Sequence, residues 1–144
     1  MSREYPERPI VGVGAVVWRG ERLLLVRRGK PPRLGQWSLP GGAQHLGETL
    51  VAAIAREVRE EAGLEVQGVE LLAAVDLVER DEAGRVRYHY TLVDFAAEAP
   101  AGDAVAGDDA AAVGWFTPAE AAELGLWSET ERIVGLAAAR RGLA

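Results

Sequence analysis

Three glutamates stand close together in a short segment that the sequence predicts to be helical. Glu60 and Glu61 follow Glu57 by three and four residues, which places all three carboxylates on one arc of the helix surface. Like charges at these spacings repel, and near a helix C-terminus they also oppose the helix dipole. A positive partner must offset this arrangement, and carboxylates one turn apart suit a hard divalent cation.

The helix is predicted over Thr49 to Ala62, with Gly63 where a C-terminal cap belongs. Its apolar residues recur at helical spacing: Leu50, Val51, Ile54 and Val58. On a helical wheel these residues form the stripe that faces the core, and Glu61 points into the same stripe. An unpaired carboxylate in that direction is costly. Glu61 therefore does not suit a solvated surface.

A solvated acidic face is the alternative explanation, with Arg56 and Arg59 as counter-ions. The inward angle of Glu61 weakens it, and so does the Pro40-Gly41-Gly42 turn before the helix. The glycines of that turn let the backbone approach a ligand closely. The residues alone thus favour metal binding over a solvated face.

Composition limits which metal such a site would hold. The chain has 144 residues, 49% of them hydrophobic, which suits a single domain over residues 1–144. It contains no cysteine and two histidines, so disulfides, thiol catalysis and cysteine-ligated zinc are excluded. Oxygen ligands remain, and they favour Mg²⁺ or Mn²⁺.

Charge and hydropathy exclude several classes of partner. The net charge of −6 disfavours nonspecific binding to nucleic acid or to anionic membranes. No apolar run approaches the roughly 20 residues of a membrane-spanning helix. The polar start, Met1 to Pro9, resembles neither a secretory signal nor a transit peptide, so we expect a cytoplasmic protein.

The remaining elements alternate between strands and helices. Strands are predicted at Ile10 to Trp18, Arg22 to Arg28, Trp37 to Leu39, Val66 to Val78, Val86 to Ala97 and Val113 to Phe116. Asp81 to Gly84 turns the long fourth and fifth strands into a hairpin, and Ala99 to Asp109 is predicted to be a mobile loop. Two further helices are predicted, from Pro118 to about Leu124 and from Ser128 to about Arg140, the latter with Ile133, Leu136 and Ala137 inward. The pattern is typical of an α/β sandwich.

The full spacing around the glutamates resembles the Nudix box. Gly42, five residues, Glu48, seven residues, Arg56-Glu57-Val58, one residue, Glu60-Glu61, one residue and Gly63-Leu64 match that pattern position by position. The strands before the box and the later run Gly114 to Pro118 are also similar to the family. The resemblance implies a Nudix α/β/α sandwich with a mixed β-sheet.

The resemblance also implies roles for the residues of the box. Glu57 and Glu61 would be metal ligands, and Glu60 a third ligand or a base acting through water. Gly41 or Gly42 would lend a backbone carbonyl. Arg56 would orient a carboxylate, that of Glu48, by paired hydrogen bonds. Activity would depend on Mg²⁺, with Mn²⁺ as a substitute.

Two positions outside this set bear on catalysis. Members of the family often carry a glutamate where this chain has His45, which we interpret as a solvated loop residue. Many members also draw a base or an extra ligand from a late acidic loop. Asp108 or Asp109 could serve here, and a solvated loop acid is the equal alternative.

Substrate-binding candidates lie before the box and on the predicted hairpin. Arg27, Arg28, Lys30 and Arg33 are a plausible basic partner for a distal phosphate or a ribose, or a solvated loop. Trp37 and Tyr88 could stack on a base, although such residues are often part of a core. Tyr88 and His89 point to opposite faces of their strand, so only one alternating set can face a cleft. Trp115 and Trp127 are interpreted as packing residues.

The resemblance is to small bacterial Nudix proteins of the ADP-ribose pyrophosphatase-like kind. It implies hydrolysis of a diphosphate bond in ADP-ribose or a related nucleotide sugar. An ordinary or oxidised nucleoside triphosphate is the alternative substrate, and a noncatalytic nucleotide-sensing module is the alternative of another class. A small nucleotide is the expected partner, neither nucleic acid nor membrane is expected, and a homodimer is left open.

Overall fold

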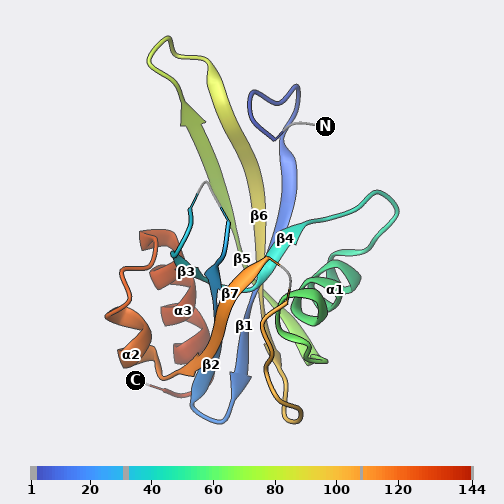
Figure 1. The fold of residues 1–144 in the computed structure, drawn as a ribbon, viewed down its shortest axis with the longest axis vertical. Helices are drawn as coiled ribbons and strands as arrows, with labels where there is room; N and C mark the ends of the chain where they lie inside the picture. Colours follow the sequence, from blue (N-terminus) through green and yellow to red (C-terminus); the bar gives the residue numbers. More distant parts are fainter. Residues whose placement is uncertain (1–2, 31–32, 108, 144) are drawn as a thin grey trace.

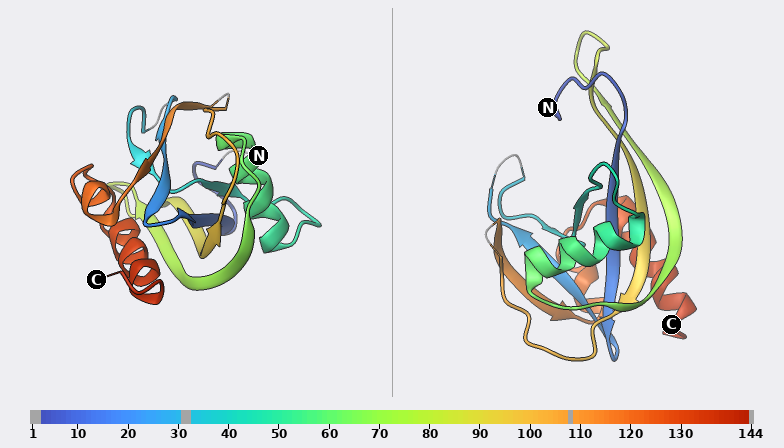
Figure 2. Two further views of the ribbon diagram at one scale, coloured as in Figure 1. Left: turned by 90° about the horizontal axis from the view of Figure 1, so that it is seen from below. Right: turned by 90° about the vertical axis from the view of Figure 1, so that its right-hand side faces the viewer.

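One mixed β-sheet lies between α1 on one face and α2 and α3 on the other (Figures 1 and 2). The computed structural model describes residues 3–30, 33–107 and 109–143. Its elements are β1 (Ile10–Arg19), β2 (Arg22–Arg28), β3 (Trp37–Ser38), β4 (Gly41–Ala43), α1 (Leu50–Ala62), β5 (Gln67–Arg80), β6 (Val86–Glu98), β7 (Ala110–Phe116), α2 (Pro118–Ala122) and α3 (Ser128–Arg140). The predicted α/β sandwich with a mixed sheet is confirmed.

Strand β1 is the centre of this sheet. The main path runs β3-β2-β1-β6-β5, while β4 also pairs with β1 and β7 with β2. The β1–β6 pair is parallel, and the other strand pairs of the described chain are antiparallel. β1 therefore connects the strand that precedes α1 to the long β5–β6 hairpin, which extends past the helices in Figure 1.

Two hydrophobic clusters use alternate residues of β1. Val13, Ala15 and Val17 pack in the cluster beneath α1, whereas Val16 and Trp18 pack in the cluster beneath α3. A strand that is covered on both faces needs an almost continuous apolar sequence. This explains why Ile10 to Trp18 shows no polar alternation.

The segment Gly41–Ala43 is a short strand, β4, whereas the sequence predicted only a turn at Pro40-Gly41-Gly42. It pairs antiparallel with β1, with Gly41 opposite Gly14. A Cβ atom at Gly41 would overlap the Val13 carbonyl. Glycine is required because the two backbones approach each other closely, and this is the property that made the segment resemble a turn.

Helix α1 begins and ends where the sequence predicted. The Thr49 hydroxyl accepts a hydrogen bond from the Ala52 N–H at 3.1 Å, and Gly63 ends the helix with φ 69°. The predicted core stripe was wrong at Val51, whose exposed fraction is 50%. The buried residues of α1 are instead Ala53, Ile54, Val58 and Ala62.

The two C-terminal helices also differ slightly from prediction. α2 ends at Ala122 rather than near Leu124, and its N-terminus has a capping box between Thr117 and Glu120. In α3 the predicted inward Leu136 is exposed, and Val134 and Ala138 are buried. None of the helices among the described residues is long and apolar enough to cross a membrane.

Candidate active site

The three glutamates of α1 lie at different depths. The Glu61 carboxylate faces the sheet, and its Oε1 accepts a hydrogen bond from the Gly41 N–H at 2.9 Å. The Glu57 side chain is 13% exposed, whereas that of Glu60 is 57% exposed. The inward direction of Glu61 that the helical wheel predicted is confirmed, and α1 is thereby linked to β4.

Burial raises the pKa of Glu61 to about 8, because the charged form loses its hydration. The hydrogen bond from Gly41 opposes this shift, while the charge of Glu57 and a hydrogen bond to Glu57 add to it. Without a bound cation, the Glu61 carboxyl therefore keeps a proton near neutral pH. A divalent cation placed between the two carboxylates would take the place of that proton.

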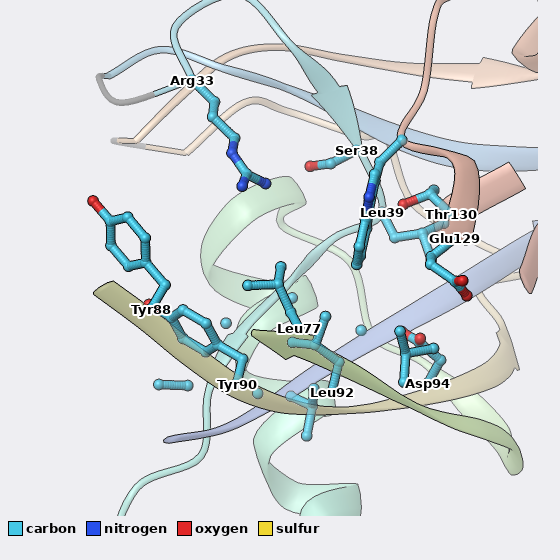
Figure 3. Close-up of a pocket in the computed structure, with 18 of the residues that line it drawn as sticks. Arg33, Ser38, Leu39, Leu77, Tyr88, Tyr90, Leu92, Asp94, Glu129 and Thr130 are labelled. Atoms are coloured by element: carbon cyan, nitrogen blue, oxygen red, sulfur yellow. The ribbon is translucent and has the colours of Figure 1, made fainter. Parts of the chain in front are cut away.

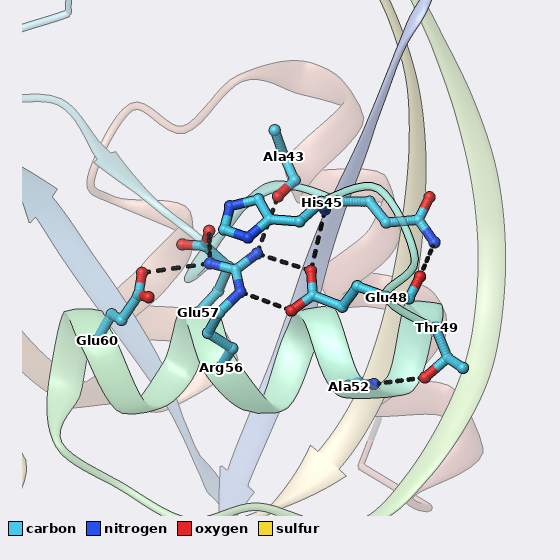
Figure 4. Close-up of polar contacts among 9 residues, drawn as sticks. Ala43, His45, Glu48, Thr49, Ala52, Arg56, Glu57 and Glu60 are labelled. Carbon is cyan, nitrogen blue, oxygen red and sulfur yellow. Dashed lines mark hydrogen bonds and ion pairs between the residues drawn. The ribbon is translucent and has the colours of Figure 1, made fainter.

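Arg56 connects four groups around this pair (Figure 4). Its Nε and Nη2 donate to the two carboxylate oxygens of Glu48 at 2.7 and 3.0 Å, and Nη2 also donates to the Ala43 carbonyl at 3.0 Å. Nη1 donates to Glu57 at 2.7 Å and to Glu60 at 3.3 Å. The paired hydrogen bonds to Glu48 have the geometry that the sequence interpretation assigned to Arg56.

Glu48 is held by hydrogen bonds to both its side-chain carboxylate and its backbone carbonyl. The hydrogen bonds from Arg56 are the main reason that the pKa of Glu48 is lowered to about 2, and the His45 N–H contributes a further hydrogen bond at 3.0 Å. The Gln44 side-chain amide donates to the Glu48 carbonyl at 2.6 Å. His45 takes part through its backbone and its side chain is exposed, as expected of a loop residue.

Space for a ligand beside Glu57 depends on Gly42. A Cβ atom at Gly42 would lie 2.5 Å from Glu57 Oε1 and 2.6 Å from its Cδ. Any larger residue would push the carboxylate out of place. The groups around this space are carboxylate and backbone oxygens, which is the donor set that a hard divalent cation takes. The residues present therefore fit such a metal.

The structure brings Glu57 and Glu61 together but leaves Glu60 apart. Among the described residues, no three acidic or histidine side chains converge on one point as a ready metal site. The reason is that the Glu60 carboxylate turns outward to Arg56. Glu60 would have to rotate away from Arg56 to join the other two.

The loop before β7 covers the C-terminal end of α1. The Val105 and Gly107 N–H groups donate to the carbonyls of Ala62 and Glu61, each at 2.9 Å. Asp109 follows on this loop, and its exposed carboxylate pairs with Lys30 Nζ at 2.6 Å, which lowers its pKa. Asp108, the other candidate, lies outside the described residues.

A cleft of about 810 Å³ is lined by β4 and not by the residues of α1 (Figure 3). Its lining includes Gly41 and Gly42, which lie against Glu61 and Glu57. Of the predicted substrate-binding residues, Arg28, Arg33, Trp37 and Tyr88 line it. Arg27 and Lys30 do not line it. The Arg27 guanidinium lies 5.8 Å from the centre of the Trp37 ring, and Lys30 pairs with Asp109. Trp127, interpreted as a packing residue, also lines the cleft.

Sequence reasoning missed several residues of this cleft. On β6, Tyr88, Tyr90, Leu92 and Asp94 all line it, and this period of two was visible once Tyr88 had been selected. Glu129 and Thr130 come from α3, which no local pattern connects to the cleft. Among the described residues, Asp94 is the one charged residue that is less than a tenth exposed, and burial raises its pKa to about 6.

Comparison with known proteins supports the resemblance. A family model described as "NUDIX domain" matches residues 8–135. A protein named ADP-ribose pyrophosphatase from Methanocaldococcus jannaschii is 33% identical over 108 residues, covering 75% of this chain and 62% of the relative. A putative 8-oxo-dGTP diphosphatase 2 from Mycobacterium tuberculosis is 55% identical over 58 residues, 40% of each chain. The matched segments thus span less than two thirds of these curated relatives.

Solved structures share the fold over most of the chain. The MutT NUDIX hydrolase of Burkholderia pseudomallei has a TM-score of 0.78 at 30% identity, covering 90% of this chain and 98% of its own. The NUDIX domain of Shewanella oneidensis NrtR, solved with ADP ribose, has a TM-score of 0.79 at 23% identity, covering 94% and 90%. The second likeness concerns the fold alone.

Replacing Arg56 by lysine should destabilise the protein by about 1–3 kcal/mol. A single ammonium group cannot keep the paired hydrogen bonds to Glu48 together with those to Glu57 and Ala43. Urea denaturation measures the change. Arg59→Lys is the matched control, because Arg59 pairs with Glu65 on the exposed surface and should cost less than about 1 kcal/mol. Equal costs for the two variants would contradict the role of Arg56.

Asp94→Asn should stabilise the protein more at pH 8 than at pH 4. The pKa of about 6 exceeds the ordinary value of 3.8, so the folded protein binds more protons between these values and its stability falls as the pH rises through them. Asparagine does not titrate and removes this loss. The gain in unfolding free energy from Asp94→Asn should therefore be roughly 2 kcal/mol larger at pH 8 than at pH 4. Urea denaturation at both pH values tests it, with the exposed Asp76→Asn as control. A benefit independent of pH would refute the buried-charge account.

Proposed function

The chain belongs to the NUDIX domain family, and we propose that it is a pyrophosphohydrolase that cleaves a diphosphate bond in a nucleoside diphosphate derivative with the help of a divalent metal ion. One observation carries the proposal. Glu57 and Glu61 lie against Gly42 and Gly41 of β4, and these two glycines line a cleft large enough for a nucleotide. A hydrolase activity agrees with the hydrolase named among the structural relatives.

Glu57 and Glu61, with the backbone carbonyl of Gly41, would hold the metal ion. Nudix hydrolases need divalent metal ions, and we propose Mg²⁺ here, with Mn²⁺ as a substitute. When bound, the ion supplies charge neutralisation for the phosphates and a more acidic attacking water. Glu60 would serve as a third ligand or as a base acting through water, once it turns away from Arg56.

The surrounding residues prepare this pair for the reaction. Arg56 holds Glu57 and Glu48 at fixed positions, so the carboxylates need not reorganise when a substrate arrives. Gly42 leaves the space next to Glu57 free. Arg28 lines the cleft and its charge acts on Glu61, so it is suitably placed to contact a phosphate. The role of Asp109 as a base or extra ligand stays a prediction.

ADP-ribose, or a related nucleotide sugar, is the first substrate we propose. The name of the archaeal relative supports it, since that protein matches three quarters of the chain. The cleft offers Trp37 and Tyr88 for stacking on a base and Arg28 and Arg33 for phosphates. Hydrolysis between the two phosphorus atoms would yield AMP and ribose 5-phosphate.

An oxidised or ordinary nucleoside triphosphate is the second candidate substrate. The mycobacterial relative named as a putative 8-oxo-dGTP diphosphatase favours it, with 55% identity over the matched segment. The products would be a nucleoside monophosphate and pyrophosphate. A noncatalytic sensing module is the weaker alternative, because Glu57, Glu60 and Glu61 are all present. Three expectations stay predictions. They are that the protein is cytoplasmic, that it binds neither nucleic acid nor membranes, and that it can form a homodimer.

Glu61→Gln should lower kcat at least about a hundredfold with Mg²⁺, because it removes a charged ligand where charge develops in the transition state. Phosphate release coupled to alkaline phosphatase measures turnover of ADP-ribose, dGTP and 8-oxo-dGTP, with Mg²⁺, Mn²⁺ or EDTA. Circular dichroism confirms folding.

Glu65→Gln is the matched control for this measurement. Glu65 lies just beyond α1, is exposed and pairs with Arg59, so its loss should change kcat less than threefold. Near-normal turnover by folded Glu61→Gln protein, or no turnover of the panel by the unaltered protein, would overturn the proposed function.

A further inference from the structure

The Asp94 carboxylate is buried without a partner at one end of the cleft. It is 8% exposed, and within residues 3–30, 33–107 and 109–143 no hydrogen bond or ion pair to it is present. The side chain lines the cleft from β6, as Figure 3 shows. A buried carboxylate costs stability unless something donates to it. The catalytic residues proposed above do not use it.

The residue paired with Asp94 on the neighbouring strand is a glycine, and this leaves room for the carboxylate. Gly14 of β1 is paired with Asp94 of β6, and a Cβ atom at Gly14 would lie 2.6 Å from Asp94 Oδ1. Every side chain larger than glycine at this position would displace the carboxylate. The carboxylate therefore lies directly over the glycine, with its oxygens available to the cleft.

Charge divides the cleft into two ends. Figure 3 places Arg33 and Tyr88 toward one end and Asp94, Glu129 and Thr130 toward the other. Glu129 pairs with Arg132 at 2.8 Å, and the charge of Arg132 also acts on Asp94 without bonding to it. An end with two carboxylates repels phosphate and favours neutral hydrogen-bond donors. The lining of the cleft also includes Leu39, Leu92 and Trp127, which suit a flat ring.

The distance from Asp94 to the metal-binding glutamates suits a nucleoside. Gly14 is paired with Gly41 on one side and with Asp94 on the other, and the Gly41 N–H holds Glu61. Gly41 and Asp94 are thus two strand spacings apart, or roughly 10 Å. A base or ribose placed at Asp94 would leave its phosphates within reach of Glu57 and Glu61.

We propose that Asp94 accepts hydrogen bonds from two neighbouring donors on the nucleoside part of the substrate and thereby selects it. This inference rests on the proposed function for its substrate class. Two parts of a nucleoside offer such a donor pair: the N–H edge of a guanine-type base and the adjacent hydroxyls of a ribose. A carboxylate accepts from both donors at once, whereas an amide presents a single acceptor.

Equilibrium binding in EDTA at pH 8 tests the proposal without requiring catalysis. Isothermal titration calorimetry measures Kd for GDP and IDP, which differ in the base amino group, and for ADP and 2′-deoxy-ADP, which differ in a ribose hydroxyl. The unaltered protein should bind one member of one pair at least about tenfold more tightly. Asp94→Asn and Asp94→Ala should both remove that difference.

The control is Asp76→Asn on neighbouring β5, which removes a carboxylate outside the lining of the cleft and should leave every Kd within twofold. A difference lost only between GDP and IDP assigns Asp94 to the base, and one lost only between ADP and 2′-deoxy-ADP assigns it to the ribose. Unchanged Kd values in both Asp94 variants, or no preference within either pair by the unaltered protein, would overturn the inference. Binding of the expected kind without hydrolysis in Mg²⁺ would instead remove the proposed function and leave the role of Asp94 standing.

Discussion

The repulsion between Glu57 and Glu61 sets the demands on the residues around them. Two carboxylates one helical turn apart, facing a sheet rather than water, cannot both ionise without compensation. Arg56 compensates Glu57, the Gly41 N–H bonds to Glu61, and the raised pKa of Glu61 lets a proton supply the rest in the absence of a cation. A divalent ion would meet the same demand, so in the proposed function a metal ion takes the place of this proton.

The central strand β1 lies between the glutamate pair and the part of the cleft proposed to bind the nucleoside. Its apolar residues belong to both hydrophobic clusters, which holds α1 and α3 on opposite faces of one sheet. Gly14 in the same strand lies between Gly41, which bonds to Glu61, and Asp94, which lines the cleft. The proposed metal-binding pair and the proposed nucleoside end of the cleft are therefore connected through one strand of the sheet.

Local patterns predicted much of this arrangement. Thr49 and Gly63 bound α1 because caps are local features, and the helical wheel placed Glu61 inward because its period is fixed by the helix. The same wheel was wrong at Val51, since packing against the sheet decides which face of a helix is buried. Strand β4 resembled a turn because its glycines serve close backbone contact. Glu129 and Asp94 could not be assigned together from sequence, because α3 and β6 come to line one cleft only in the folded protein.

Direct titration with Mn²⁺ tests the central claim that the Glu57 and Glu61 pair holds a divalent ion. Electron paramagnetic resonance of free Mn²⁺ gives the number of ions bound and their affinity without any substrate. The account predicts that the unaltered protein removes at least one equivalent of free Mn²⁺ and that Glu57→Gln weakens this binding at least about tenfold. A free Mn²⁺ signal that the protein leaves unchanged up to millimolar concentrations, or equal binding by Glu57→Gln, would contradict it.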